Sequence, residues 1–438
     1  MSDEYKKLSY DSYREDMRSF GQFDENSSFV VAVSGGADSL ALTFLLADWC
    51  KKNNIKLSAV TVDHGLRQGS AKEAESVNSL LKKNNINHII LRWIGDKKSS
   101  NIQAEARDAR YKLITDFCKD NNAKFLFVAH NKQDQAETVL LRLMRGSGVD
   151  GLSGIAEDSQ INGVRVIRPL LSYSKNEIRA FLRQEGHEWI EDPSNENIKY
   201  ARVNVRKFIE SAEDSDLLID RLAETSLNLR RSRDYIETKM SQDCKEVFFI
   251  KSEGYCILDW KKFNSLHEEV AYRLLSSIVK IVGGEYYKPR FEKIKTLYYA
   301  IKDNNLAGGN TLGGCIIFSD KNKEHIVIAR ELSSIRSDIK IEPGQKVFWD
   351  NRFSCELDGQ IKNSYTISNL GQEGLKQITD SGLDISEIFY SKKIIYSLPA
   401  LKILEKIVAV PQINYYNDSD LQDAISIKFV YEENSFFK

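Results

Sequence analysis

The segment Ser34–Ser39, SGGADS, places two glycines between an apolar run and an amphipathic one. The apolar run Phe29–Val33 is typical of a buried strand, and Ser39–Asn53 carries leucines at helical spacing. Glycines let successive backbone N–H groups surround phosphate oxygens, and the N-terminus of a following helix adds partial positive charge. The lysine of the phosphoryl-transfer loop G-x-x-x-x-G-K-[ST] is missing. This strand–loop–helix unit predicts a nucleotide site of another kind; a plain glycine turn is the alternative.

Strand-like and helical runs alternate from this loop to about residue 145. Because strands that alternate with helices of this length pair in parallel, we expect an α/β fold with a doubly wound parallel sheet. Ligands of such sheets bind at the carboxyl ends of the strands, where Ser34, Asp63 and His130 would lie. Ser70, three residues before Glu73, predicts a capping box at a helix start. Strands are predicted at Leu57–Val62, His88–Trp93 and Phe125–Ala129, and helices at Gln103–Asn121 and Ala136–Arg145.

The rest of the chain divides at a shift in charge and at a turn. The acidic cluster SAEDSD follows the basic run ARVNVRK, which predicts a first domain over residues 1–215. A helical pattern to about Ile301, followed by a hairpin over 311–331, predicts a mainly helical domain over 216–340. Mixed short patterns after Pro343–Gly344 predict a small α+β domain over 341–438. The glycine-rich stretch 146–154 is either a plain surface loop or a loop ordered by binding.

Composition excludes several classes of protein. No apolar run approaches the roughly 18 residues of a membrane helix, and the polar N-terminus lacks the apolar core of a secretion signal. The net charge of −1 gives no overall attraction to nucleic acid, so RNA binding requires locally segregated charge. Six scattered cysteines without a C-x-x-C pair argue against a disulfide scaffold or zinc site and favour a reducing cytoplasm. They are Cys50, Cys118, Cys244, Cys256, Cys315 and Cys355.

An ordered set of motifs resembles the tRNA(Ile)-lysidine synthetases, which belong to the PP-loop ATP pyrophosphatases. The resemblance covers residues 28–210 and continues more weakly through Leu398–Leu401 and Ile407–Val410. Besides SGGADS, the motifs are Val62–Arg67, Ala106–Tyr111, Ala129–Thr138, Arg145–Gly148, Arg168–Leu171 and Trp189–Asn195.

The resemblance implies an enzyme that uses ATP to adenylate O2 of the wobble cytidine in the minor isoleucine tRNA with a CAU anticodon. The ε-amine of free L-lysine would then attack C2 and expel AMP. ATP and Mg²⁺ are the implied cofactors, the tRNA and lysine are the partners, and no membrane is involved. Whether two copies form a homodimer is left open.

The resemblance also assigns roles to residues of this chain. Asp38, Asp134 and Arg206 would be catalytic, with Asp38 positioning Mg²⁺ and a second metal contact from Asp134 left open. Asp134 and Glu137, three apart on one helix face, would hold and deprotonate lysine; a solvated acidic helix start is the alternative. ATP would be bound by Ser34, Gly35, Gly36, Ala37, Asp38, Ser39 and His130, although His130 is equally well explained as a core histidine.

Two positions depart from the family pattern. Gln133 replaces the first aspartate of H-x-x-D-D-Q-x-E-T, so a metal site with two carboxylates at this point is in doubt. Val203 stands where the family motif R-N-x-x-R has asparagine, so the role of that asparagine does not transfer to this chain. Arg202 and Arg206 keep the four-residue spacing of the two arginines of the motif.

Arginines and lysines provide candidate contacts to phosphates and tRNA, since guanidinium groups bind phosphate bidentately. For each cluster a solvated or salt-bridged surface is the alternative. The candidates are Arg107, Arg110, Arg202, Arg206, Arg230, Arg231, Arg233, Lys392 and Lys393.

Two other functions compete with this hypothesis. A PP-loop enzyme that thiolates tRNA would need an activated cysteine or an iron–sulfur cluster, and no cysteine here has a partner at motif spacing. A non-catalytic tRNA-binding relative would be free to lose the carboxylates of the loop and of Ala129–Thr138, yet they are present.

Overall fold

The computed structural model describes residues 7–24, 27–65, 69–94, 102–190, 201–306, 308–336, 338–383, 391–417 and 420–431. The chain divides into two compact units, Met1–Arg233 and Asp234–Lys438, with the boundary inside helix α9 (Ser215–Asp243). The division into three domains at 215 and 340 stays a prediction. No helix in the described ranges has the length and apolar character needed to cross a membrane.

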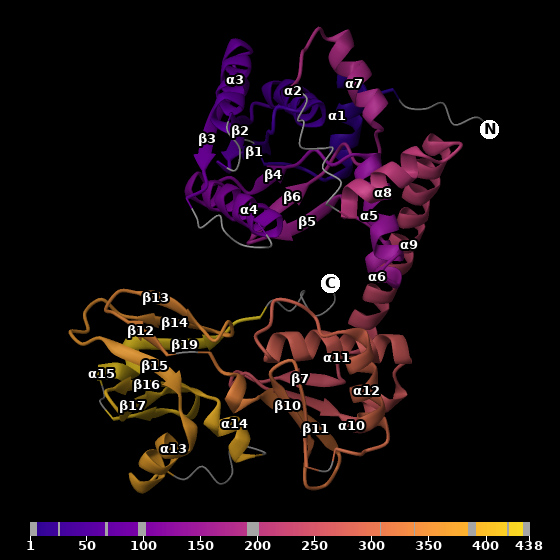
Figure 1. Ribbon diagram of the computed structural model, residues 1–438. Coiled ribbons are helices and arrows are strands. Elements are labelled where there is room, and N and C mark those ends of the chain that lie inside the picture. Colours follow the sequence, from indigo (N-terminus) through magenta and orange to yellow (C-terminus); the bar gives the residue numbers. More distant parts are fainter. Residues whose placement is uncertain are drawn as a thin grey trace. The chain divides into compact units, whose positions relative to one another are not determined.

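A six-stranded sheet forms the centre of the first unit (Figure 1). The strand order is β3-β2-β1-β4-β6-β5; the first five strands run parallel, and β5 pairs antiparallel with β6 at the edge. The predicted α/β fold with a mostly parallel sheet is thereby confirmed. The strands are β1 (Ser28–Ala32), β2 (Lys56–Asp63), β3 (Asn87–Arg92), β4 (Phe125–Phe127), β5 (Asp158–Ile161) and β6 (Val164–Ile167).

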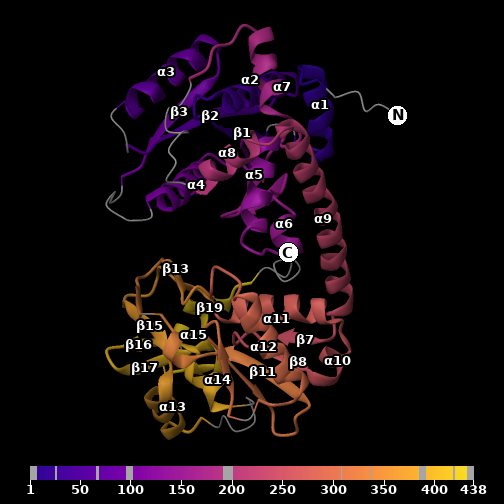
Figure 2. The same cartoon turned by 45° about the vertical axis from the view of Figure 1, so that its right-hand side comes forward.

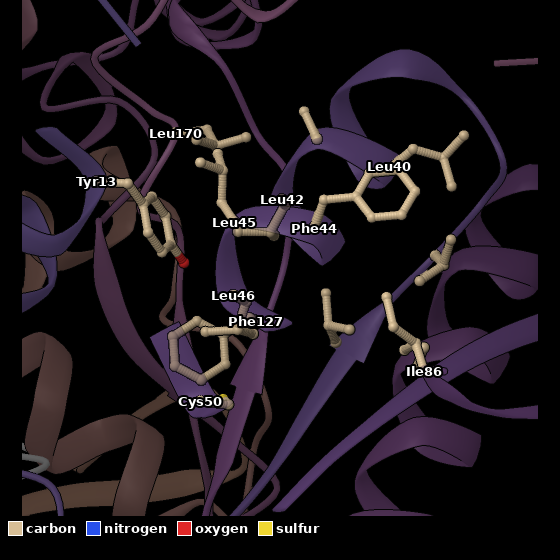
Figure 3. Packing of buried hydrophobic residues seen from close by; sticks show 14 of the residues in the cluster. Tyr13, Leu40, Leu42, Phe44, Leu45, Leu46, Cys50, Ile86, Phe127 and Leu170 are labelled. Atoms are coloured by element: carbon tan, nitrogen blue, oxygen red, sulfur yellow. The ribbon is translucent and has the colours of Figure 1, made fainter. Parts of the chain in front are cut away.

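Helices cover both faces of this sheet because successive strand side chains point to opposite sides. Phe29 and Val31 of β1 belong to the larger core, which also takes side chains from α1, α2, α3 and α7 (Figure 3). Val30 faces the other way and packs with residues of α4. The helices are α1 (Tyr10–Ser19), α2 (Ala37–Lys52), α3 (Ser70–Lys83), α4 (Ile102–Asp120), α5 (Lys132–Leu143), α6 (Val149–Leu152), α7 (Lys175–Gln184) and α8 (Ala201–Glu210).

Several local predictions in this unit need correction. Ser70 does not cap α3: it is the first helical residue, preceded by Gly69 at φ +106°, and its Oγ donates to Asp63 Oδ1 at 2.7 Å. Helix α5 begins four residues before the predicted start, because Asn131 caps it and the apolar pattern sets in only later. The glycine-rich stretch 146–154 is partly helical, since it contains α6.

The second unit combines helices with antiparallel sheets. A five-stranded sheet of order β7-β8-β11-β10-β9 packs on α11 and α12, and two smaller sheets follow, β12-β15-β16-β17-β18 and β13-β14-β19. The strands are β7 (Phe248–Ile250), β8 (Cys256–Asp259), β9 (Asn310–Leu312), β10 (Cys315–Ser319), β11 (His325–Arg330), β12 (Ile339–Ile341), β13 (Lys346–Trp349), β14 (Phe353–Leu357), β15 (Tyr365–Asn369), β16 (Pro399–Ile403), β17 (Lys406–Val410), β18 (Tyr415–Tyr416) and β19 (Ile425–Phe429). The helices are α10 (Trp260–Ser265), α11 (Glu268–Val282), α12 (Phe291–Lys302), α13 (Gly371–Asp380), α14 (Lys392–Tyr396) and α15 (Asp420–Ala424).

The predicted hairpin is present in this unit: β10 and β11 pair antiparallel, with Cys315 opposite Arg330. Strands β7 and β8, in contrast, lie in the region predicted to be helical throughout. Each has only three or four residues between helical runs, too few for a period-two pattern to stand out.

Candidate active site

The loop between β1 and α2 is shaped to receive an anion. Gly35 has φ +86°, and a Cβ there would lie 2.8 Å from Val77 Cγ2, so both the backbone and the packing require glycine. At Gly36 a Cβ would meet only Ser34 Oγ, at 3.8 Å, so the space beside this backbone is open. No side chain caps α2, whose N-terminal N–H groups therefore have no side-chain acceptor. Room beside the backbone and free helix N–H groups are what a phosphate needs.

Two serines fix the shape of this loop. Ser39 Oγ accepts a hydrogen bond from Ser34 N at 3.1 Å and lies 3.2 Å from Ser34 Oγ. It also donates to Gly36 O at 3.0 Å. The two ends of the loop are thereby joined before any ligand binds.

Asp38 lies in the first turn of α2 and accepts a hydrogen bond from Asn131, a residue far away in the sequence. Asn131 Nδ2 donates to Asp38 Oδ2 at 2.9 Å, and Asn131 itself is fully buried. Burial and the charge of Asp134 raise the pKa of Asp38, while Lys175, the Asn131 hydrogen bond and Arg179 oppose this shift. Asp38 is thus a desolvated carboxylate with a second carboxylate nearby.

Asn131 connects the two carboxylates, and sequence reasoning missed it. Its Oδ1 accepts from Asp134 N at 2.9 Å, and its own backbone N–H donates to Asp134 Oδ2 at 3.1 Å, which forms a capping box at α5. The N-x-x-D spacing was the available signal. Gln133, at the position of the missing aspartate, accepts from Lys175 N at 2.9 Å and so contacts the start of α7.

Asp134 and Glu137 are brought together with Arg202 and Arg206, because α8 lies beside α5 (Figure 2). Arg202 contacts both carboxylates, with Nη2 2.6 Å from Asp134 Oδ1 and Nε 2.6 Å from Glu137 Oε2. Arg206 Nε is 2.7 Å from Glu137 Oε1. Although burial lowers the pKa of Arg206, its hydrogen bond to Glu137 and the nearby negative charges raise it overall. The Glu137 side chain is only 2% exposed, whereas those of Arg202 and Arg206 are 37% and 26% exposed.

A cavity of about 410 Å³ opens beside the loop, at the carboxyl ends of β1, β2 and β4. Its lining includes Ser34, Asp63, Arg110, Tyr111 and His130. Motifs far apart in sequence therefore meet where ligands of such sheets bind.

His130 lines this cavity as a neutral ring. Burial, followed by the charges of Arg168, Arg107, Arg202 and Arg110, lowers the pKa of His130 to about 3. Its Nδ1 is buried and has no hydrogen-bond partner among the described residues. This nitrogen is consequently available to a ligand. The alternative was a core histidine that bonds a backbone carbonyl, and Nδ1 makes no such bond to any residue that the structure describes.

Arginines of two further motifs place positive charge near this cavity: Arg110 lines it, and the charges of Arg107 and Arg168 act on His130. The guanidinium groups of Arg107 and Arg110 lie 5.3 and 5.7 Å from the ring centre of Tyr111, and burial lowers the pKa of Arg110. Arg168, also missed as an individual site residue, donates to Ala156 O at 2.8 Å and Ser159 Oγ at 2.9 Å. Arg110 therefore brings a cation to the cavity wall, with Arg107 also near the ring of Tyr111.

The other predicted tRNA contacts lie outside this cluster. Arg230 Nη2 donates to Ile155 O, and Arg233 Nη1 donates to Ser153 Oγ at 3.1 Å, so both contact the segment after α6. Arg231 bonds Asn228 on the surface of its own helix. Lys392 and Lys393 belong to α14 of the second unit, where Lys393 Nζ is 5.5 Å from the ring centre of Phe318. Motif residues 66–67 and 191–195 lie outside the described residues.

Together, the parallel sheet, the uncapped glycine loop and the adjoining cavity define a PP-loop nucleotide-binding protein. The family model described as "PP-loop domain" matches residues 9–213. The chain is 38% identical to the tRNA(Ile)-lysidine synthase of Wolbachia pipientis wMel over 408 residues, which cover 91% of this chain and 92% of the relative. It is 34% identical to that of Orientia tsutsugamushi (94% and 95% covered) and 36% to that of Ruegeria pomeroyi (80% and 81%). The chain belongs to the tRNA(Ile)-lysidine synthase family and is an ATP-dependent ligase.

Proposed function

We propose that this protein joins L-lysine to the wobble cytidine of the isoleucine tRNA with a CAU anticodon, in two steps at the cluster around Asp38. In the first step, O2 of the cytidine attacks the α-phosphorus of ATP and pyrophosphate leaves. In the second, the ε-amine of lysine attacks C2, the C2–O bond to AMP breaks, and the amine loses its proton. The observation that carries the proposal is the Asp38–Asn131–Asp134 bridge, which joins two helix N-termini beside a nucleoside-sized cavity.

ATP fits this site in two parts. The open space at Gly36 and the uncapped start of α2 would receive the phosphates. The cavity lined by Asp63, Tyr111 and His130 would receive the nucleoside, with His130 Nδ1 as a hydrogen-bonding partner.

Mg²⁺ fits the same place because it prefers carboxylate oxygens. Asp38 and Asp134 would hold the ion; burial and, after it, the charge of Asp134 raise the pKa of Asp38, and a divalent cation would offset that charge. When bound, it would neutralise charge on the pyrophosphate leaving group. Gln133 is turned toward α7 and adds no carboxylate.

Asp134 and Glu137 would bind the lysine side chain next to Arg202 and Arg206, with which they form ion pairs. The two carboxylates attract the ammonium group, whereas the two guanidinium groups disfavour its charge and so lower the pKa of the amine. A neutral amine is the form that can attack C2. Arg206 remains close to the reacting groups, where it would stabilise charge on the adenylated intermediate.

The cysteines favour lysine transfer over thiolation. All six are free and buried, and burial raises their thiol pKa values, to about 12 for Cys118, Cys244, Cys315 and Cys355. Protonated, inaccessible thiols are poor nucleophiles. Six reduced cysteines also support a cytoplasmic location as part of this proposal.

The test is to incubate the purified full chain with ATP, labelled lysine and the isoleucine tRNA. We expect lysine in the tRNA together with one AMP and one pyrophosphate for each lysine added. AMP release without lysine transfer, or sulfur transfer instead, would support another PP-loop chemistry, and tRNA binding with no ATP consumption would support the non-catalytic alternative.

A further inference from the structure

The connection between α11 and α12 presents aromatic rings to solvent. Tyr286 is 70% exposed and Tyr287 is 84% exposed, although tyrosine rings are normally more than half buried. The guanidinium group of Arg336 lies 5.7 Å from the ring centre of Tyr286. Tyr286, with a guanidinium group near its ring, and Tyr287 therefore expose two adjacent aromatic rings that a partner can contact.

This part of the chain is also strongly basic. Residues 279–302 contain six Lys or Arg and two Glu, a local net charge of +4 in a chain of net charge −1. Lys288, Arg290, Lys293 and Lys295 are all exposed there. We call Tyr286, Tyr287, Lys288, Arg290 and Lys293 the tyrosine–lysine surface. Its charge is the local segregation that RNA binding requires when the whole chain is nearly neutral.

Two adjoining cavities of about 460 Å³ each lie along this surface. One is lined by Tyr287, Pro289 and Arg290, and the other by Thr296, Asn310 and Glu331; Lys293, Leu312 and Gly313 line both. The cavities therefore form a continuous groove between α12 and the turn that joins β9 to β10.

We propose that the tyrosine–lysine surface binds an unpaired stretch of the tRNA substrate, with bases stacked on Tyr286 and Tyr287 and the backbone in the groove. This inference rests on the proposed function, which supplies tRNA as the partner, and adds where and how that partner is held. Exposed rings contact the faces of bases, and base faces are accessible only where RNA is single-stranded. Exposed Arg290 and Lys293 beside the rings match the phosphates of such a strand. An acidic peptide would also bind the cations, but unlike RNA it has no bases to stack on the two rings.

The first experiment measures binding of a fluorescent twelve-nucleotide single-stranded RNA to the full chain, in competition with duplex RNA, with intact tRNA and with poly-glutamate. We expect intact tRNA and the single strand to compete and the duplex and poly-glutamate to compete at least about 10-fold less well. Tyr286→Ala/Tyr287→Ala should weaken binding about 10-fold or more, the loss expected for one or two stacked bases. Phe249→Ala/Phe348→Ala removes two rings that are also about half exposed and should leave binding unchanged.

The second experiment varies salt. Replacing two phosphate contacts by Arg290→Gln/Lys293→Gln should reduce the slope of log affinity against log salt by about 1.4, since each single-strand contact contributes about 0.7. In the lysine-transfer reaction both double variants should raise the KM for tRNA and leave kcat and the KM for ATP unchanged.

The inference is overturned if either double variant binds as the wild type does, if duplex competes as well as single strand, or if poly-glutamate competes best. These outcomes are independent of catalysis. A wild-type chain that transfers no lysine would overturn the proposed function, whereas active variants with an unchanged KM for tRNA would overturn this inference alone.

Discussion

Two clusters of arginine and carboxylate differ in their composition and in their access to solvent. At the proposed active site, Asp134 and Glu137 face Arg202 and Arg206, so the charges balance, and both guanidinium groups are partly exposed. In the second unit a single carboxylate, Asp350, binds two arginines, and all three side chains are 0% exposed. The same chemical groups thus occur once at a solvent-accessible site and once in a core.

The buried cluster joins separate segments of the second unit. Arg330 binds both oxygens of Asp350, at 2.8 and 2.9 Å, and also donates to Gly283 O at 2.5 Å. Arg352 donates to Asp350 Oδ2 at 2.7 Å, and burial lowers the pKa of Arg352 to about 10. At Gly314 a Cβ would lie 2.2 Å from Arg330 Nη1, so the turn before β10 is glycine where the guanidinium group passes.

Solvent access distinguishes ion pairs whose partners can be exchanged from ion pairs that are fixed in a core. Water reaches Arg202 and Arg206, so in the proposed reaction substrate groups would be able to replace one of their partners. Asp350 cannot be exchanged in this way, because water does not reach it and its removal would leave two guanidinium groups in a core with no anion. We therefore expect the first cluster to govern reaction rates and the second to govern stability.

The largest expected effect is on folding. Asp350→Asn should lower the free energy of unfolding of the second unit by about 3–5 kcal/mol, the cost of breaking a buried ion pair. Urea unfolding followed through buried Trp349, next in sequence to Asp350, measures this effect. Asp134→Asn is the matched change at the accessible cluster and should cost about 1 kcal/mol. Equal losses in the two variants would remove the distinction between the clusters.

Asp38→Asn should reduce AMP formation by about 10²–10³-fold, because it deletes a charge at the reacting phosphates. Stability should be unchanged or slightly higher at neutral pH, since burial and Asp134 disfavour the ionised form of Asp38. Asp48→Asn, at the far end of the same helix in a surface pair with Arg14, is the control. Near-normal turnover of Asp38→Asn would mean that ATP reacts elsewhere.

Glu137→Gln should lower kcat/KM for lysine by about 10–100-fold, the loss of a charged hydrogen bond worth about 1.5–3 kcal/mol. The KM for ATP should change little, because Glu137 contacts Arg202 and Arg206 and does not line the nucleotide cavity. Steady-state kinetics with each substrate varied in turn measures both. A change confined to ATP would assign Glu137 to the nucleotide instead.

The smallest effect concerns pH. Because the pKa of His130 is lowered to about 3 in the folded chain, an unfolded histidine binds a proton near pH 6.5 that the folded one does not. Stability is therefore lost as pH falls below about 6.5, by about 1–2 kcal/mol at pH 5. His130→Gln should reduce this loss, as measured by unfolding at pH 7 and pH 5. An identical pH dependence in both proteins would show that His130 is not held neutral by the fold.

The sequence predicted the elements whose structure is determined by residues close to one another in the chain. The strand predicted at Phe29–Val33 and the helix predicted at Ser39–Asn53 are confirmed to within two residues, because β-branched residues, glycines and leucines follow one another within a single unit. The contact of Asn131 with Asp38 joins residues 93 positions apart, and that of Arg202 with Glu137 joins residues 65 apart. No local pattern reports such contacts. The capping role expected for Ser70 was wrong because its hydroxyl bonds Asp63, in another element.

The buried cluster shows the same limit. Arg330 follows the apolar residues of β11, and in sequence its charge favours a strand end at the surface. Only the fold places Asp350 and a backbone carbonyl around it. The motif therefore points to the carboxylates of the proposed active site, whereas no motif points to the buried ion pairs of the second unit.

Competition between amino acids for the full chain tests the proposed roles of Asp134 and Glu137 most directly. These two carboxylates, balanced by Arg202 and Arg206, would select a substrate that carries an amine. Norleucine and glutamine have no side-chain amine to attack C2, so they serve as competitors: we predict that each binds at least about 10²-fold more weakly than lysine, because neither offers a side-chain charge to the carboxylates. Glu137→Gln should narrow this difference. Inhibition of lysine transfer by norleucine at concentrations comparable to the KM for lysine would contradict the roles proposed for Asp134 and Glu137.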